Sequence, residues 1–461
     1  MKKRKIVSIF AATVIIIVAV FLNIPNQEEI QETELSHSHF IADFDYMISA
    51  MEENFPFFGV TYRLLGFDIH ELAAEVRASL INDPNMDGLS FYHYVSENFI
   101  SHFEGLAHLG LLPFHHFQYF GLYSNFIDSS FFGDSDMNFI NPSFEFEPLS
   151  IAFDLPIFER DIVETYIFEE GRIAYINFPT FSHIDIHFGW HSRLNSVVSN
   201  FIATLEGYEH LIVDIRETRG GLFHGFVDSI IKPNINEPFQ DIGFAFHTGG
   251  RHASFISEAH RWFTVAHPGP LSAIYYLYYY PAEMNVSDIF QVTLRRFTVF
   301  ASQFTSDMID PDIGFGLTTA TEIVERYNLI YINPNDLANL DYGFRTITHI
   351  RPNPTAPAFD GQIWLLTSPN NFSASEAAAR FAKETGVAML VGETTGGAIG
   401  GTSHIRLPNT SLILRWDTIY FTDRYGRSLE EYRTTPHFEN RPGLDALETV
   451  LAIIEEKTTE M

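Results

Sequence analysis

Apolar residues recur with a helical period between residues 39 and 112. In FDYMISAMEENFPFF, Phe44, Met47 and Met51 stand at i, i+3 and i+7, on one face of a helix that Pro56 ends. The stretches DIHELAAEVRASLI and FYHYVSENFISHF repeat this behaviour. Residues 39–112 are therefore predicted to form a small helical domain.

The pattern changes after residue 112. Residues 113–168 are rich in Phe, Asn, Ser and Pro and show little period, so we expect a linker of irregular chain or short strands. From residue 169 to 455, short apolar runs alternate with helical stretches and glycine turns. The apolar runs are RIAYINF, HLIVDIR, QIWLLTS and VAMLVGE. This alternation predicts an α/β core with a largely parallel sheet, in which reactive groups lie beyond the carboxyl ends of strands.

A long insertion interrupts this core at about residues 240–355 and contains AIYYLYYYPAEM. A stretch of this length is too long for one structureless loop in a compact domain. Two interpretations stay open. The insertion is either an added packing layer with an aromatic core, or a lid or substrate wall over the site.

The first 24 residues have the pattern of an export signal. Basic MKKRK precedes an uncharged apolar run, Ile6 to Ile24, which is about long enough to span a bilayer. No small-x-small cleavage site follows, which favours an uncleaved membrane anchor over a cleaved signal peptide. Residues 25–38 are polar and acidic and are expected to be a linker. Either way the remaining chain is expected outside the cytoplasm, membrane-anchored or secreted.

Composition removes several classes of function. The formal net charge of −30, from 58 acidic and 28 basic residues, disfavours nucleic acid as a partner. The chain has no cysteine, so thiol nucleophiles and cysteine metal sites are excluded. His108, His115 and His116 lie close in sequence, but no H-E-x-x-H is present, and neither is a G-x-S-x-G or a phosphate-binding glycine fingerprint. We expect no metal and no cofactor.

The stretch NNFSASEAAARF raises the question of what Ser373 does. Ser373 and Glu376 have the S-x-x-E spacing of a capping box, in which the two side chains satisfy free amides of a first helical turn. Alternatively Ser373 is a nucleophile at a helix N-terminus, where the dipole and the next amide favour developing negative charge. The two roles are compatible, so this stretch alone does not decide between them.

Three strand ends, taken in order, resemble the C-terminal processing (tail-specific) serine peptidases and their tricorn-type relatives. The family has D-x-R-x-N-x-G-G, then S-A-S-E, then G-E-x-T-x-G. Thr218 replaces the asparagine of the first pattern. The matching positions here are Asp214, Arg216, Gly220, Gly221, Ser373 to Glu376, Gly392, Glu393, Thr395 and Gly397.

The resemblance implies a fold like that of Clp protease and crotonase, and hydrolysis of polypeptides through an acyl-enzyme. Ser373 would be the nucleophile. The amide of Ala374 and one from Gly220 or Gly221 would form the oxyanion hole.

The resemblance leaves the general base to be identified. One branch of the family uses a lysine after G-E-x-T-x-G, where this chain has Ala398, and Lys383 is most simply a surface residue. The tricorn-like branch uses a histidine from the amino-terminal region. His108 in FEGLAHLG matches it, and a histidine near neutral pKa suits the role.

The same tricorn-like branch also implies a glutamate that orients or polarises the site. Glu430 fits that position, although His437 replaces an aspartate that follows it in the family.

Plainer interpretations stay open beside these. His108 could be an ordinary surface or core histidine, Glu430 a surface acid, Arg216 part of a structural ion pair, and Glu393 a brace for its turn. The whole chain could be a non-catalytic protein of the same fold that binds peptides or apolar ligands, or a structural surface protein with no cleft near Ser373. The oligomeric state is not determined by the sequence.

Overall fold

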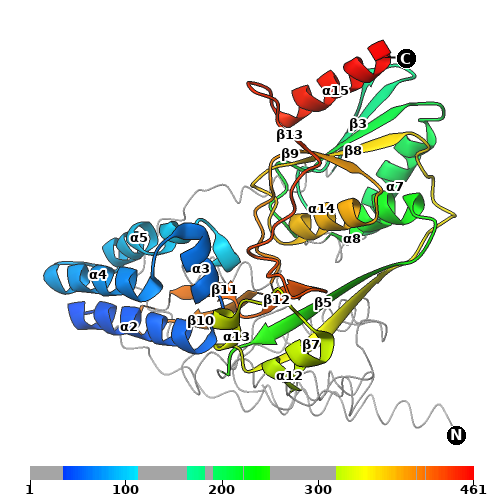
Figure 1. Cartoon of the computed structure of the whole chain (residues 1–461). Coiled ribbons are helices and arrows are strands. Elements are labelled where there is room, and N and C mark those ends of the chain that lie inside the picture. The colour runs from blue at the N-terminus through cyan, green and yellow to red at the C-terminus, as the bar shows by residue number, and fades with distance from the viewer. Residues whose placement is uncertain are drawn as a thin grey trace, which may run out of the picture.

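The computed structural model describes residues 35–112, 163–181, 190–221, 223–249, 318–400, 402–410 and 412–460 (Figure 1). The expected anchor, most of both linkers and the aromatic stretch of the insertion lie outside these ranges. Within them, no helix is long and apolar enough to cross a bilayer.

A six-stranded sheet in the order β13-β9-β8-β4-β3-β2 forms the centre of the α/β core. All neighbouring strands are parallel except β2, which is antiparallel to β3. The predicted α/β class with a largely parallel sheet is confirmed. The strands are β2 (Glu164–Glu169), β3 (Ile173–Asn177), β4 (His210–Asp214), β8 (Gln362–Thr367), β9 (Met389–Gly392) and β13 (Phe438–Glu439). Because β4, β8 and β9 are parallel, their carboxyl ends meet at one edge.

Helices cover both faces of this sheet, which explains why its strands are apolar without a break. Leu211 and Val213 of β4 face the layer of α7 (Trp190–Ala203) and α14 (Ala374–Glu384), whereas Ile212 between them faces α15 (Ala446–Glu460). Figure 1 shows α15 on the opposite side of the sheet from α7 and α14. Three short helices follow β4: α8 (His224–Phe226), η6 (Val227–Ile231) and η7 (Lys232–Asn234).

The predicted amino-terminal helices are present and pack around phenylalanine side chains. Phe40 stacks on Phe91, and Phe44 meets Phe99 edge-on. Asp68 and Asp87 cap two of these helices with their carboxylates. The helices are α2 (His37–Asn54), α3 (Phe58–Leu65), α4 (Ile69–Asn82) and α5 (Gly88–Asn98), followed by the 3₁₀ turns η1 (Ile100–Phe103) and η2 (Leu106–His108).

Two further sheets lie beside these helices and share their core (Figure 1). One has the order β1-β11-β10 and the other β12-β5-β7-β6. The strands are β1 (Gly110–Leu112), β5 (Phe239–His247), β6 (Thr318–Thr319), β7 (Tyr342–Ile350), β10 (Thr402–Arg406), β11 (Ile413–Asp417) and β12 (Tyr420–Asp423). The described flanks of the insertion are therefore regular, because β5 and β7 pair over nine residues and α12 (Ala320–Tyr327) and α13 (Pro334–Leu337) follow β6.

A buried carboxylate joins the helical part to the loop between β10 and β11. Asp43 on α2 is fully buried and accepts hydrogen bonds from the amides of Asn409 and Thr410, at 2.9 and 2.6 Å, and from the Asn409 side chain at 2.8 Å. Asp45, two residues on, is exposed and pairs with Arg77.

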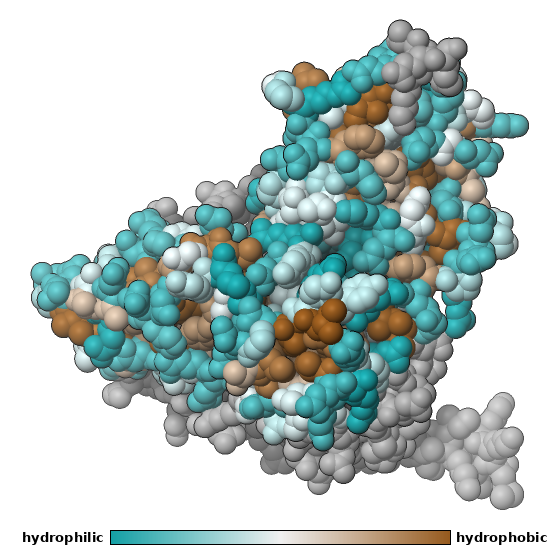
Figure 2. All heavy atoms as spheres, viewed as in Figure 1, coloured by the Kyte–Doolittle hydropathy of each residue, from teal (hydrophilic) through white to brown (hydrophobic). Residues whose placement is uncertain are grey.

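Hydrophilic residues cover most of the described surface on the face seen in Figure 2.

Asp43→Ala is expected to lower the free energy of unfolding by about 2–4 kcal/mol, because two buried amides lose their acceptor. The matched control Asp45→Ala removes an exposed ion pair and is expected to cost under about 1 kcal/mol. Urea denaturation of both variants measures the difference. Equal losses would contradict the structural role given to Asp43.

Candidate active site

Loops from the carboxyl ends of β4, β8 and β9 meet at one edge of the central sheet and are joined by buried polar side chains. Asn371 donates to the carbonyl of Ile215 at 2.5 Å and accepts from the amide of Ser368 at 2.8 Å. The Ser375 hydroxyl donates to the carbonyl of Thr218 at 2.7 Å. The β8 loop is thereby fixed against the glycine turn that follows β4.

Ser373 occupies the N-cap position of α14 in a conformation that serine rarely adopts. Its φ of 56° and ψ of −119° correspond to the first central position of a type II′ turn, where glycine is preferred. Its side chain makes no capping hydrogen bond, and its amide donates to the carbonyl of Gly397 at 2.9 Å. The Ser373 hydroxyl therefore lies at the N-terminus of α14 but does not cap the helix.

Of the two interpretations left open, the capping box is not formed, because Ser373 makes no capping hydrogen bond and Glu376 accepts from other segments. Its buried carboxylate accepts from the amide of Gly397 at 3.3 Å, and from the amide and hydroxyl of Thr434 at 3.1 and 2.6 Å. The first turn of α14 thus keeps amides without intrahelical partners, including that of Ala374.

The glycine pair after β4 lies in close contact with neighbouring segments, Gly220 with Ser373 and Gly221 with Phe181. A Cβ at Gly220 would come within 3.0 Å of the Ser373 Cβ, and one at Gly221 within 1.4 Å of the carbonyl oxygen of Phe181. Both glycines have φ above 100°. Only glycine fits at these two positions. The backbone of Gly220, and no side chain, therefore faces Ser373.

His108 ends the turn η2, two residues before β1, and contacts a buried aspartate. Its Nδ1 lies 2.9 Å from both carboxylate oxygens of Asp417. Strand pairing explains the contact: Gly110 is opposite Arg415 in the antiparallel pair of β1 and β11, so the same register carried two residues further places His108 opposite Asp417. The Arg415 Nε also donates to the His108 carbonyl at 3.2 Å.

The sequence did not identify Asp417 as a site residue. The only local signal was a carboxylate at the end of the apolar strand SLILRWD. A carboxylate at a strand end identifies a site residue only when the partner strand and its register are known.

Glu430 is buried and accepts two backbone hydrogen bonds from different segments. The Ala107 amide donates to Oε1 at 2.9 Å and the Ala398 amide to Oε2 at 2.7 Å. Burial, and next the negative charge of Asp417, raise the pKa of Glu430 to about 7. Among the described residues, these two amides donate to Glu430, so it holds the backbone beside His108 rather than the imidazole.

These contacts bring the segments of His108 and Ser373 together. Glu430 joins Ala107 to Ala398, and the next residue back, Gly397, accepts from the Ser373 amide. A Cβ built on Gly105 would lie 3.8 Å from the ring of Phe372, so the turn before His108 also lies beside the segment of Ser373. Within the described chain, the Ser373 hydroxyl makes no hydrogen bond to His108, a geometry common in enzymes without substrate.

The remaining residues singled out in the sequence interact with residues other than Ser373 and His108 or are exposed. Lys383 donates to the carbonyl of Thr435 at 2.6 Å. Arg216 forms ion pairs with Asp214 and Asp445 at 2.7 and 3.0 Å, and Glu393 is exposed. His437 accepts from the amide of Leu390 on β9 at 2.9 Å.

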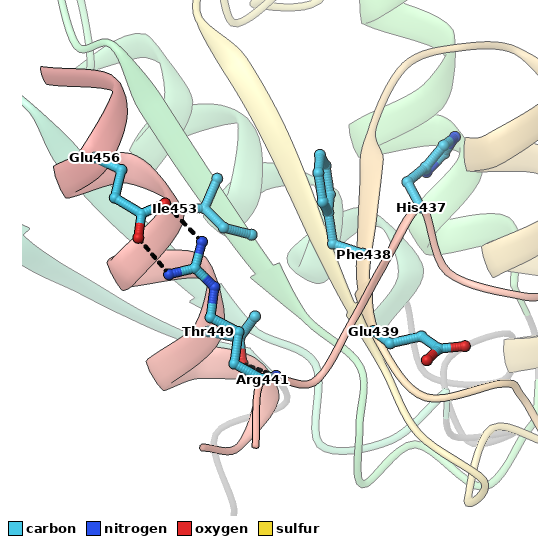
Figure 3. Close-up of a pocket in the computed structure, with 7 residues that line it drawn as sticks. All are labelled: His437, Phe438, Glu439, Arg441, Thr449, Ile453 and Glu456. Carbon is cyan, nitrogen blue, oxygen red and sulfur yellow. Dashed lines mark hydrogen bonds and ion pairs between the residues drawn. The ribbon is translucent and has the colours of Figure 1, made fainter. Parts of the chain in front are cut away.

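A hollow of about 480 Å³ between β13 and α15 is separate from this site. Figure 3 shows Arg441 paired with Glu456 in it, and Thr449 and Ile453 on the same helix as Glu456. None of its lining residues belongs to the loops that carry Ser373, Gly220 or His108. Over the described residues, no group of three histidine or acidic side chains is placed to hold a metal ion.

Comparison with known proteins adds a family match. The model of the family "Peptidase family S41" matches residues 172–274 and 277–440, which is more than half of the chain. No curated protein matches the sequence.

Solved structures resemble the chain over most of its length. Mature CPAF complexed with lactacystin has a TM-score of 0.51 at 12% identity, over 87% of this chain and 94% of that one. Mature CPAF alone has a TM-score of 0.50 at 12% identity, over 87% and 92%. A protein from Parabacteroides merdae described as a peptidase has a TM-score of 0.49 at 14% identity, over 92% and 96%. The CPAF likeness shows a shared fold.

Ser373→Gly is expected to be more stable than Ser373→Ala by about 1 kcal/mol, because glycine relieves the strained backbone while both variants lack the hydroxyl. Urea denaturation measures the difference. The control is Ser196, an exposed residue in the interior of α7, where glycine should instead be less stable than alanine by about 0.5–1 kcal/mol. The same order at both positions would contradict the strain at Ser373.

The raised pKa of Glu430 predicts a pH dependence of stability. Folding takes up a proton between the ordinary pKa of 4.5 and the folded value of about 7. The contribution of Glu430 to the free energy of unfolding therefore falls as pH rises through that window, by at most about 1.4 kcal/mol per unit. Glu430→Gln should remove this slope, and Glu104→Gln, an exposed control on the His108 segment, should retain it. Equal slopes in both variants, from urea denaturation between pH 4 and 8, would refute the assignment.

Proposed function

Because the chain belongs to peptidase family S41, we propose that it is a serine endopeptidase that cleaves polypeptides through an acyl-enzyme. Ser373 is the nucleophile and His108 the general base. The observation that carries the proposal is the backbone of Ser373, whose strained conformation at the N-terminus of α14 leaves its hydroxyl free of capping. Such strain is found where structure positions a reacting group.

In this mechanism the Ser373 hydroxyl attacks the carbonyl carbon of the scissile peptide, and its proton passes to Nε2 of His108. The same proton then goes to the leaving amine, which departs as the amino-terminal end of one product. Water repeats the sequence on the ester and restores Ser373. A histidine supports this chemistry near neutral pH, whereas Ala398 has no group to accept a proton.

The oxyanion formed in each step requires preorganised donors. The amide of Ala374 has no partner within its helix, and the backbone of Gly220 lies against Ser373 without a side chain between them. We assign Ala374 and one amide of the pair Gly220 and Gly221 to the oxyanion hole. Loss of one such donor typically slows acylation by about 10²–10³-fold.

We also infer a core of the Clp protease and crotonase type. The parallel strands β3, β4, β8 and β9, with helices on both faces, support this inference.

For localisation, we propose export with retention at the membrane by residues 1–24. The basic start and the uncharged run Ile6 to Ile24 support it.

A fluorophosphonate probe on the chain from residue 35 onward tests the serine mechanism, with the adduct mapped by mass spectrometry. We expect labelling at Ser373, none in Ser373→Ala, and a loss of at least about 10²-fold in His108→Ala. His102→Ala, an exposed histidine on the same segment, serves as the control and should label normally. No labelling of folded protein would refute the proposal and favour a binding protein. Labelling that survives His108→Ala would place the base elsewhere.

A further inference from the structure

We propose that Asp417 is the positioning residue of this site: it fixes the tautomer and orientation of His108, while Glu430 holds the backbone and not the imidazole. This assignment rests on the proposed function and names the group that makes His108 a base. The carboxylate that the sequence assigned to orient the site was Glu430.

Asp417 has the geometry for this role. Both carboxylate oxygens lie 2.9 Å from Nδ1 of His108, and the Asp417 side chain is completely buried while that of His108 is 16% exposed. A carboxylate at this distance accepts a hydrogen bond from a protonated Nδ1. It therefore selects the neutral tautomer whose Nε2 carries a lone pair.

The position of Asp417 is fixed by regular structure. It is the last residue of β11, which is hydrogen-bonded on both sides by β1 and β10. His108 is attached to β1 through Leu109, so the two side chains face each other across a defined register. A site built on strands holds its geometry more tightly than one built on loops.

Glu430 has a different set of partners. Its two oxygens are each occupied by a backbone amide, from Ala107 and Ala398. The charged groups that face it are Asp417, His108 and Arg433, and Arg415 faces Asp417. Glu430 thus sets where the His108 segment lies relative to the Ser373 segment, and Asp417 sets how the ring is turned.

The proton balance follows from this division. In acylation the Ser373 proton moves to Nε2 of His108, which becomes an imidazolium with its Nδ1 proton still hydrogen-bonded to the Asp417 carboxylate. The Asp417 carboxylate does not take up that proton and stabilises the cation, and Nε2 returns the Ser373 proton to the leaving amine. No other co-reactant is needed.

The test combines histidine NMR with labelling kinetics. In the full-length chain at alkaline pH, ¹⁵N shifts of His108, assigned with His108→Gln, should show a protonated Nδ1 and an unprotonated Nε2. In Asp417→Asn the tautomer preference should be lost, because the carboxylate that accepts from Nδ1 is gone. The fluorophosphonate labelling rate should fall by about 10³–10⁴-fold.

Glu430→Gln is the matched comparison, since it also removes one buried carboxylate charge. It should lower thermal stability but leave the His108 tautomer as it is. Near-UV circular dichroism confirms that each variant is folded.

The outcomes separate the two proposals. A wild-type His108 protonated at Nε2, or a tautomer unchanged by Asp417→Asn, would overturn the role of Asp417, whether or not Ser373 reacts. The first of these needs no variant, so misfolding of Asp417→Asn leaves the proposal testable. A tautomer that depends on Asp417 in a protein that does not label would uphold the positioning role and refute the peptidase mechanism.

Discussion

Two hydrogen bonds to one buried carboxylate hold the candidate site together. Glu430 accepts from Ala107, in the amino-terminal segment, and from Ala398, in the turn behind Ser373. Neither amide is part of a regular strand, so without this acceptor both would be buried donors without a partner. Because these segments are separated by almost 300 residues of chain, the carboxylate converts two independent loops into one surface with a fixed geometry.

The chain uses buried carboxylates repeatedly for this purpose. Asp43 binds the loop between β10 and β11, and Glu376 binds Gly397 and Thr434. Acidic side chains accept several backbone amides at once, and charge-assisted hydrogen bonds are stronger than neutral ones. Some of the excess acid in this chain, with its net charge of −30, is therefore internal and structural and not only a matter of solubility.

Reactivity and stability are balanced against each other at Ser373. Ser373 takes a backbone conformation better suited to glycine. Position 220 must be glycine, because a side chain there would contact Ser373 too closely. Asn371, Ser375 and Glu376 supply the hydrogen bonds that keep this arrangement in place. The helical amino-terminal part then has two roles, because it shares an aromatic core with the two smaller sheets and leads through His108 into β1, opposite β11.

The sequence by itself determined the parallel α/β core, the amino-terminal helices and the strand ends that carry Ser373, Gly220 and Gly221. These are local properties, since apolar periodicity and glycine turns are written in neighbouring residues. The S-x-x-E spacing left a capping box open as one role of Ser373 and Glu376, because spacing cannot reveal that Glu376 has distant partners. Only the tertiary structure decided that Asp417 faces His108, because that contact depends on the register of β1 against β11, and pairing between remote strands leaves no local trace in the sequence.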